Sequence, residues 1–444
     1  MIGLRRSAAR LVLTLPTLGA VWSPLRTLER TQWLPAERLK DIQIRRLKLL
    51  LSHARRSVPY YRSLDANVFK VNNLDDLASF PILTRAQARQ HFDDLQSLES
   101  AGGQITRSSG SMGRLVRVRK SPLTLRMESA AQYRSYRWVG FDFGDRYGYI
   151  LPVYRSAWTQ VRNPIADLLL PRTSMDAFNI DNAKLTRFVR VLQSKPTVLV
   201  ANPSALLVLA KYVEENNIRP KVKLIISTSD QLLCDERRRL VSILGAKLYD
   251  FYGSNEIGSI AAECEESIGH HISSENVIVE IIGRDGTPVP AGQVGSVVLT
   301  DLNNFTMPLI RYEIGDMSSL LEDECPCGRG LPLLGPVEGR ITDVLVTPDG
   351  RFMCLSTFYG RVLSNTHVEQ FQIHQSSLRE ITVRAILRPE WRTVEADYIQ
   401  RVVGEIVGDE VKVKVEFPEM LEVRGSGKRC LVKSDLLPRA SERP

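Results

Sequence analysis

Apolar residues near the start of the chain recur at helical spacing. Between residues 39 and 61 the repeat places them at Ile42, Ile44, Leu47, Leu50 and Leu51. Arginines and lysines fill the opposite face and Pro59 ends the pattern, so we expect an amphipathic helix up to that proline. Two more helices are predicted, one capped by Thr84 and one over residues 124–138.

The pattern then alternates between short apolar runs and helical repeats. PTVLVAN (196–202) and KVKLIISTS (221–229) are rich in Val and Ile, as buried strands are. SALLVLAKYVEENN (204–217) and CDERRRLVSILG (234–245) have helical spacing. This strand–helix–strand order predicts an α/β region built on a parallel sheet.

The remainder of the chain is richer in strands. NVIVEIIG and GSVVLT, within residues 276–300, predict a β-rich section. ITVRAIL and EVKVKVEF flank the helical stretch EADYIQRVVGEIVG near the C-terminus, which predicts a small α+β domain of about a hundred residues. We therefore expect an α/β protein with an N-terminal arm (1–38), a large domain (39–340) and a small, mobile C-terminal domain (341–444).

Composition and charge limit the classes of partner. The 444 residues are 43% hydrophobic and 25% charged, with a net charge of +9, which favours anionic partners such as nucleotides, coenzyme A, nucleic acid or a membrane surface. We find no helix-turn-helix signature, no zinc-finger spacing and no aromatic–basic run, so we do not expect nucleic acid as a partner. The six cysteines are widely spread, which indicates a reducing compartment and a cytoplasmic protein.

The N-terminal segment allows two interpretations. It has a basic start and an apolar run from Leu11 to Trp22 that Pro16 interrupts. That run is shorter than the ~20 residues needed to span a bilayer, and no clear cleavage site of a signal peptide follows it. The segment is either a helical arm packed on the body, or an arginine-anchored segment over residues 1–28 that rests on a membrane surface.

A loop with the sequence RSSGSMGR (107–114) could hold phosphate groups. Its backbone N–H groups and hydroxyls can converge on phosphate oxygens, but it lacks the Gly-Lys-Ser/Thr ending of a P-loop, and by itself it fits a surface turn equally well.

Four more motifs follow it along the chain. They are YDFYGSNEIGS (249–259), a turn with an acidic residue after a strand; PLIRYEIGDMSSL (308–320), a strand ending at Gly315 and Asp316; GPVEGRITDVLVTPDG (335–350); and SGKRCLVKS (426–434), a glycine turn followed by Lys428.

The five motifs, in this order, resemble the adenylate-forming (acyl-CoA synthetase) superfamily. They are most similar to its phenylacetate–coenzyme A ligase-like branch, which includes proteins associated with capsule and surface-polysaccharide biosynthesis. The resemblance extends from about Leu47 to Lys428. It implies that a carboxylate attacks the α-phosphate of ATP to form an acyl-adenylate, and that a thiol, usually that of coenzyme A, then takes the acyl group.

The resemblance also implies roles for particular residues. Ser108, Ser109, Gly110, Ser111 and Gly113 would hold the β- and γ-phosphates. Tyr252 would lie against the adenine ring, Glu256 would help to hold Mg²⁺, and Gly253 and Asn255 belong to the same nucleotide-binding motif. Asp316 would accept hydrogen bonds from the ribose hydroxyls, and Arg340 would contact ribose or phosphate. Lys428 would stabilise charge on the carboxylate and α-phosphate, delivered by rotation of the C-terminal domain about a hinge at Asp343.

Three segments depart from the family pattern. Met112 replaces a hydroxyl residue and Arg114-Leu115 replaces the usual end of the phosphate loop. Asn255 replaces a threonine, although its amide can still donate to phosphate. SDQLL (229–233) stands where the family has a Gly- or Ser-rich turn followed by Glu-Pro-Leu. The residues with central roles are all retained, so we expect an active enzyme.

Cysteine and histidine residues indicate a separate metal site. Cys264 is followed by His270 and His271, and a Cys325-Pro-Cys327 pair comes later. Three thiols and one imidazole suit tetrahedral zinc, although reduced cysteines in a turn would give the same pattern. Some members of the resembled branch carry such a structural zinc, and by likeness to their Leu-His-Ile segment we prefer Cys264, His271, Cys325 and Cys327 as ligands.

Three functions are consistent with the sequence. The first is an ATP- and Mg²⁺-dependent ligase that activates a carboxylic acid and transfers it to coenzyme A. The second keeps the adenylation but uses an amine or hydroxyl acceptor in surface-polysaccharide biosynthesis. The third is a non-catalytic nucleotide-binding protein, which would have no need for Lys428.

Overall fold

The structure is a computed structural model of the 444-residue chain. It describes residues 19–100, 102–108, 115–151, 172–177, 180–283, 285–340, 345–346, 348, 352–353, 368–387, 395–408, 410–421 and 432–436. Within these residues, no helix combines the length and the apolar character that crossing a membrane requires.

The largest sheet has eight strands in the order β13-β9-β8-β7-β6-β5-β3-β4. Five of them pair in parallel: β3 (Tyr147–Leu151), β4 (Arg172–Asp176), β5 (Thr197–Ala201), β6 (Val222–Thr228) and β7 (Leu248–Ser254). The antiparallel ones are β8 (Gly258–Glu263), β9 (His270–Ile272) and β13 (Leu333–Leu334). The predicted α/β region with a parallel sheet is confirmed.

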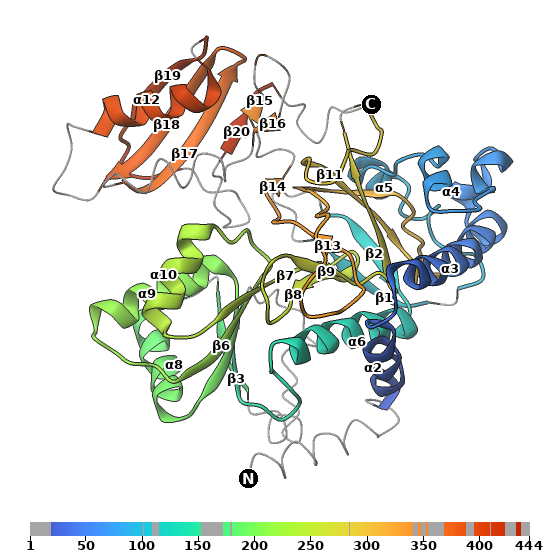
Figure 1. The fold of residues 1–444 in the computed structure, drawn as a ribbon, viewed down its shortest axis with the longest axis horizontal. Helices are drawn as coiled ribbons and strands as arrows, with labels where there is room; N and C mark the ends of the chain where they lie inside the picture. Colours follow the sequence, from blue (N-terminus) through green and yellow to red (C-terminus); the bar gives the residue numbers. More distant parts are fainter. Residues whose placement is uncertain are drawn as a thin grey trace.

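Helices pack on both faces of this sheet. The connecting helices α8 (Asn182–Ser194), α9 (Pro203–Glu215) and α10 (Cys234–Leu244) share one apolar cluster with β3, β5 and β6, and Figure 1 shows them together beside the parallel strands. The other face receives α6 (Pro122–Trp138), where Tyr136 stacks on Phe251 of β7 with ring centroids 5.7 Å apart. The alternating apolar pattern of the sequence thus corresponds to strands buried on both faces.

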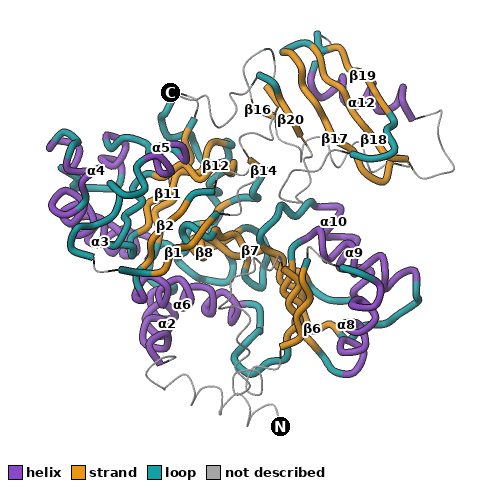
Figure 2. Tube along the Cα trace, turned by 180° about the vertical axis from the view of Figure 1, so that it is seen from behind, coloured by secondary structure: helices purple, strands orange, loops and turns teal. Residues whose placement is uncertain are grey.

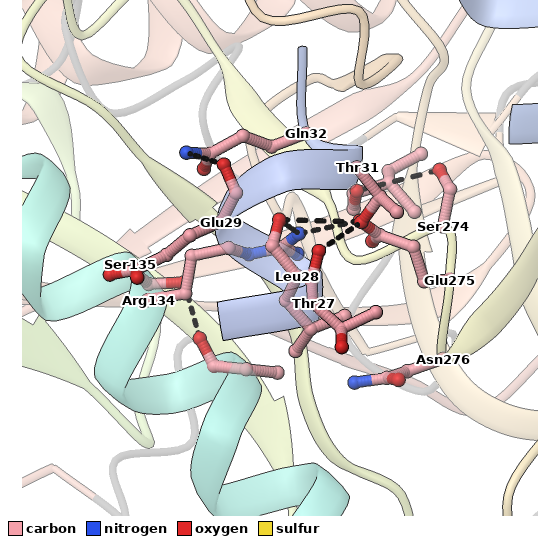
Figure 3. A network of polar contacts seen from close by, with 12 residues as sticks. Thr27, Leu28, Glu29, Thr31, Gln32, Arg134, Ser135, Ser274, Glu275 and Asn276 are labelled. Atoms are coloured by element: carbon pink, nitrogen blue, oxygen red, sulfur yellow. Dashed lines mark hydrogen bonds and ion pairs between the residues drawn. The ribbon is translucent and has the colours of Figure 1, made fainter. Parts of the chain in front are cut away.

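A buried ion pair attaches the N-terminal helix to the body. Helix α2 (Gly19–Thr31) packs along α6, and the fully buried Arg134 of α6 donates to Glu275 Oε1 at 2.8 Å and to the Leu28 carbonyl at 3.3 Å. Thr31 of α2 donates to the same carboxylate oxygen (Figure 3). A charge buried this deeply is tolerated only when it is paired, so the network fixes α2 against α6. The described part of the predicted N-terminal arm is therefore packed on the body.

A second part of the large domain carries the β-rich section. Helices α3 (Ala36–Ser57), α4 (Pro59–Arg62) and α5 (Arg85–Gln90), with the short helices η1 (Ala66–Phe69) and η2 (Asp75–Ser79), surround an antiparallel sheet. Its strands are β10 (Val277–Ile282), β11 (Gly295–Asp301), β12 (Tyr312–Ser318) and β14 (Gly339–Arg340). The predicted helix end before Pro59 and the Thr84 cap are confirmed, and Thr84 makes a complete capping box with Gln87.

The C-terminal part forms a separate α+β unit with its own apolar core (Figure 2). Its four-stranded sheet has the order β19-β18-β17-β20, from β17 (Val368–Ser377), β18 (Glu380–Leu387), β19 (Lys412–Glu416) and β20 (Val432–Ser434). Helix α12 (Glu395–Val407) packs on it, and β15 (Leu345–Val346) pairs with β16 (Phe352–Met353). The expected strands and helix are present, whereas β17 was not predicted.

One residue of the large domain joins this C-terminal core. Leu233, which precedes α10, is 3% exposed and belongs to the same apolar cluster as Leu345 and Val368. It ends the segment 229–233, where the sequence departs from the family pattern. The domain boundaries at residues 38 and 340 remain predictions.

Candidate functional site

Two of the predicted nucleotide-binding residues meet between the two sheets. Tyr252 of β7 donates its hydroxyl hydrogen to Asp316 Oδ2 of β12 at 2.8 Å. Asp316 is also the cross-strand partner of Arg340 in β14. The sequence-based local structure was wrong in two places: β7 continues through Ser254 where we expected a turn, and β12 continues to Ser318 where we expected a strand end at Asp316. The tertiary pairing of each strand extends it beyond its apolar run.

Glu256, the predicted magnesium ligand, is held by two donors. Glu256 is 3% exposed, and its Oε1 lies 3.0 Å from Arg85 Nη1 and 3.4 Å from Tyr312 Oη. Burial strongly raises the pKa of Tyr312, so this phenol remains a hydrogen-bond donor. Burial alone would lower the pKa of Arg85, but the negative charges of Glu256 and Asp316, together with Tyr312, raise it overall. The Arg85 guanidinium is therefore positively charged beside the Glu256 carboxylate.

Arg85 connects three parts of the site. Besides Glu256, it donates to the Ile314 carbonyl at 2.9 Å and, through Nη2, to Ser108 Oγ at 3.3 Å. Its position depends on strand-like pairing, since the Leu83 N–H donates to Arg311 O and the Glu313 N–H donates to Leu83 O. Arg85 was not among the functional residues predicted from the sequence. The available signal was FPILTR, an arginine directly after a capped helix start.

Ser108 is the only predicted phosphate-loop residue within the described part of the chain. It follows β1 (Gln104–Arg107), which pairs with β2 (Arg117–Lys120). Its hydroxyl accepts the Val116 N–H at 2.8 Å, so the base of the loop is closed by hydrogen bonds. Asn255 donates one amide hydrogen to the Arg107 carbonyl at 3.0 Å. Its predicted contact with phosphate remains a prediction.

Gly253 has a packing reason to be glycine. A Cβ atom at this position would lie 2.7 Å from the Gly258 carbonyl oxygen, which is closer than two non-bonded heavy atoms can approach. The missing side chain lets β7 and β8 approach each other on either side of the turn that carries Glu256. The remaining predicted residues lie outside the described residues or have no described side chain; these are Ser109, Gly110, Ser111, Gly113, Asp343, Lys428 and the side chain of Arg340.

The four predicted zinc ligands form one cluster. The ligand atoms of Cys264, His271, Cys325 and Cys327 all lie within 4.8 Å of one another. The two closest pairs are Cys264 Sγ to Cys325 Sγ at 3.6 Å and Cys327 Sγ to His271 Nε2 at 3.3 Å. The other ring nitrogen of His271 contacts the Leu331 carbonyl at 3.2 Å, which leaves Nε2 facing the thiols. His270 instead contacts Asp250 at 3.1 Å.

The chemistry of this cluster suits a cation. Burial lowers the pKa of His271 to about 4, so its imidazole is neutral, as a metal ligand must be. Burial raises the pKa of Cys264 to about 12, so without a cation this thiol is protonated. A divalent cation would stabilise the thiolate form, and three sulfurs with one nitrogen are the donors of a closed, structural zinc site.

An aromatic cavity lies between α6 and the large sheet. It has a volume of about 220 Å³, and its aromatic lining consists of Tyr133, Tyr136, Phe141, Phe143, Tyr147 and Tyr149. Tyr136 is stacked on Phe251, the residue before Tyr252. One wall of the cavity is thus continuous with the strand that carries the predicted adenine contact.

Known proteins share this architecture. No protein-family model matches the chain. It is 28% identical over 333 residues to a phenylacetate–coenzyme A ligase of Thermus thermophilus, covering 70% of this chain and 73% of the relative. A phenylacetate–coenzyme A ligase of Pseudomonas putida is 26% identical over 422 residues, covering 89% and 93%.

Solved structures agree with the sequence relatives. A 2-hydroxyisobutyryl-CoA ligase in its postadenylation state superposes with a TM-score of 0.74 at 21% identity, over 92% of each chain. The chain has the fold of the adenylate-forming ligases. ATP-bound MatB from Rhodopseudomonas palustris, with a TM-score of 0.56 at 15% identity over 75% of this chain and 68% of MatB, shares that fold. The fold class expected from the motifs is confirmed, and the sequence relatives support the phenylacetate–coenzyme A ligase-like branch of the adenylate-forming ligases.

Proposed function

We propose that the protein is an AMP-forming acid–thiol ligase that activates a carboxylic acid with ATP and transfers the acyl group to coenzyme A. The observation that carries this proposal is the convergence of functional groups on Arg85. This guanidinium contacts Glu256 and Ser108, and its charge interacts with Asp316. The groups expected to hold the metal, the phosphates and the ribose of ATP thus belong to one connected cluster.

In the first half-reaction a carboxylate oxygen attacks the α-phosphorus of ATP. The new O–P bond forms as the bond from the α-phosphorus to its bridging oxygen breaks, and pyrophosphate leaves. Asp316 would accept hydrogen bonds from the ribose hydroxyls. A carboxylate has about four acceptor sites, and the hydrogen bond from the Tyr252 hydroxyl occupies one of them. Ser108 and Arg85 supply donors on the phosphate side, where negative charge accumulates.

Magnesium fits Glu256. Carboxylate oxygens are typical Mg²⁺ ligands, and this buried carboxylate has acceptor sites beyond those used by Arg85 and Tyr312. When bound, the ion neutralises phosphate charge. The hydrogen bond from Arg85 holds the Glu256 carboxylate in position.

In the second half-reaction the thiol sulfur of coenzyme A attacks the acyl carbon. A C–S bond forms, the acyl–phosphate C–O bond breaks and AMP leaves. We propose that Lys428 acts in adenylation and that the C-terminal unit then rotates about Asp343. The burial of Leu233 in the C-terminal core gives this unit a contact point on the large domain.

We propose that the aromatic cavity beside Phe251 takes the side chain of the acid. Its lining combines six aromatic rings with the charged residues Arg137, Asp142, Asp145 and Arg172. The rings favour a flat aromatic group, which agrees with the phenylacetate named for the sequence relatives. Phenols among these rings would also accommodate a ring hydroxyl on the acid. Arylacetic and hydroxyarylacetic acids are therefore the first substrates to test.

We also propose a structural zinc ion at Cys264, His271, Cys325 and Cys327. These residues come from the end of β8, from β9 and from the loop after β12. A bound zinc would connect that loop to the large sheet. Since no ligand position is left for substrate, this site has no part in the chemistry.

Pyrophosphate exchange into ATP, measured over a panel of aryl and alkyl acids, tests the proposed function. We expect exchange that depends on one class of acid and is lost in Lys428→Ala, and thioester formation when coenzyme A is added. Exchange without thioester, but with acyl transfer to an amine or hydroxyl, would support the acceptor chemistry expected of capsule-associated relatives. Tight ATP binding with no exchange for any acid would support a non-catalytic nucleotide-binding protein.

A further inference from the structure

The solvent-facing side of α3 carries a stripe of exposed cations. Arg45, Lys48, Ser52 and Arg55 are exposed and recur every three or four residues, so they lie along one face of the helix. Among the described residues, the cations of this stripe form no ion pair with an acidic side chain. Lys48 interacts electrostatically with Asp76 without a close ion pair, and the Asp76 carboxylate accepts hydrogen bonds from the backbone N–H groups of Asn72 and Asn73 at 2.7 and 3.1 Å.

A groove runs along one flank of this stripe. It has a volume of about 720 Å³, with cationic side chains of Lys48, Arg55, Arg56 and Lys70 around it and an apolar floor of Leu51, Phe69 and Val71. The Arg55 guanidinium carbon lies 5.8 Å from the centre of the Phe69 ring. Positive charge therefore stands directly beside apolar surface.

Exposed apolar side chains follow the other flank. Leu49 is 64% exposed, Leu98 69% and Phe305 36%. His53 lies one helical turn after Leu49, and its ring packs against the Phe305 ring with centroids 5.3 Å apart. This contact positions Phe305 on the same flank. Leu98 is placed by its N–H, which donates to the Ser57 carbonyl at the end of α3. These three side chains extend along α3 next to the cations.

We propose that this face of α3 docks on an anionic phospholipid surface. Lipid phosphates would neutralise Arg45, Lys48 and Arg55, and the interfacial region of the bilayer would take up Leu49, Leu98 and Phe305. A nucleic acid or a soluble phosphate compound would satisfy the cations but leave the leucines in water. The combination of cations flanked by apolar side chains therefore selects the membrane interface.

The position of α3 in the fold is compatible with this contact. Figures 1 and 2 show α3 and α4 at the edge of the large domain, on the side away from β17, β18, β19 and α12. Docking through α3 would leave the C-terminal unit accessible to coenzyme A. The inference does not depend on the proposed catalytic function, because none of its residues belongs to the candidate site.

Vesicle co-sedimentation of the full chain tests the proposal. Vesicles of phosphatidylcholine alone are compared with vesicles of phosphatidylcholine and phosphatidylglycerol, at low and at high NaCl. The test variant is Arg45→Glu/Lys48→Glu/Arg55→Glu, and the control is Arg187→Glu/Arg190→Glu/Arg219→Glu, three exposed cations elsewhere on the large domain. Since each cation near an anionic surface strengthens binding severalfold, we expect the test variant to lose at least about tenfold in partition coefficient and the control less than about threefold. Leu49→Ser should lower binding with no change in salt dependence.

Several results would overturn the proposal. One is failure of the unaltered chain to bind anionic vesicles better than neutral ones. Another is an equal loss in the two triple variants, which would assign the attraction to net charge. Unchanged binding of the test variant would place the membrane contact elsewhere in the chain. Stronger retention on single-stranded DNA than on vesicles at equal salt, lost in the test variant, would assign the face to nucleic acid. Far-UV circular dichroism and thermal melting of each variant separate these results from unfolding.

Discussion

The Arg85 guanidinium lies 3.0 Å from the Glu256 carboxylate, and Glu256 is buried, with 3% of its surface exposed. This pair joins α5 to the turn after β7, and the second nitrogen of Arg85 reaches the first serine of the phosphate loop. Removing one partner of a buried pair leaves the other charge uncompensated, at a cost of about 3–5 kcal/mol. Arg85 is therefore central to the geometry of the candidate site.

We predict that Arg85→Ala lowers acid-dependent pyrophosphate exchange by about two orders of magnitude, since it removes a preorganised donor on the phosphate side and releases Glu256. Arg85→Lys should recover part of the rate, because a lysine keeps the charge but cannot reach Glu256, Ile314 and Ser108 together. Pyrophosphate exchange is measured at varied concentrations of ATP and Mg²⁺. If Glu256 is no longer held in position, a higher Mg²⁺ concentration should be needed for half-maximal exchange. Equal rates for Arg85→Ala and the unaltered chain would contradict a role in the site.

The Tyr252–Asp316 contact predicts unequal effects of two conservative substitutions. Asp316→Asn replaces an acceptor-only group with one that is half donor, so the KM for ATP should rise by about tenfold or more. Tyr252→Phe removes the 2.8 Å hydrogen bond but keeps the ring, and the KM should rise by less than about fivefold. If Tyr252→Phe proves the more damaging change, the phenol rather than the carboxylate holds the nucleotide.

Metal analysis tests the cysteine–histidine cluster. Freshly purified protein should contain about one equivalent of zinc, and Cys325→Ser should lower both the zinc content and the melting temperature. Cys234→Ser is the matched control, since Cys234 is exposed and lies outside the cluster; it should leave both quantities unchanged. Less than about half an equivalent of any divalent metal would count against the site.

Asp301 predicts a pH dependence of stability. Burial, together with the nearby Glu128 carboxylate, raises the pKa of Asp301 to about 7 from its ordinary value of 3.8. Its Oδ2 atom is buried and makes no hydrogen bond to any described residue. Between these two pH values the unfolded chain has lost a proton that the folded protein retains, so the free energy of unfolding falls as the pH rises from about 4 to about 7.

Asp301→Asn should remove this dependence. The variant and the unaltered chain should therefore differ least near pH 5, and the variant should gain relative stability toward pH 8. Urea unfolding at four pH values between 5 and 8 measures the difference. Parallel stability curves for the two proteins would show that Asp301 does not titrate in this range.

Much of the architecture follows from local sequence. The apolar pattern predicted β5, β6, α9 and α10 because these elements are buried on the faces that the pattern marks. Thr84 and Pro59 mark helix ends through capping and the loss of an N–H, which are properties of neighbouring residues. The order of the five motifs then predicted the fold. Tyr252 and Asp316, both predicted to bind the nucleotide, are in hydrogen-bond contact.

Tertiary structure decided the rest. The Arg85–Glu256 pair joins residues 171 positions apart, and it exists only because Leu83 pairs with Tyr312 beside α5. Strands β7 and β12 extend to Ser254 and Ser318 because neighbouring strands satisfy their backbone groups there, in segments whose side chains carry no strand pattern. Cys264 and Cys325 likewise meet across 61 positions. Contacts of this kind depend on how sheets and loops pack, so they cannot be predicted from the local periodicity of apolar residues.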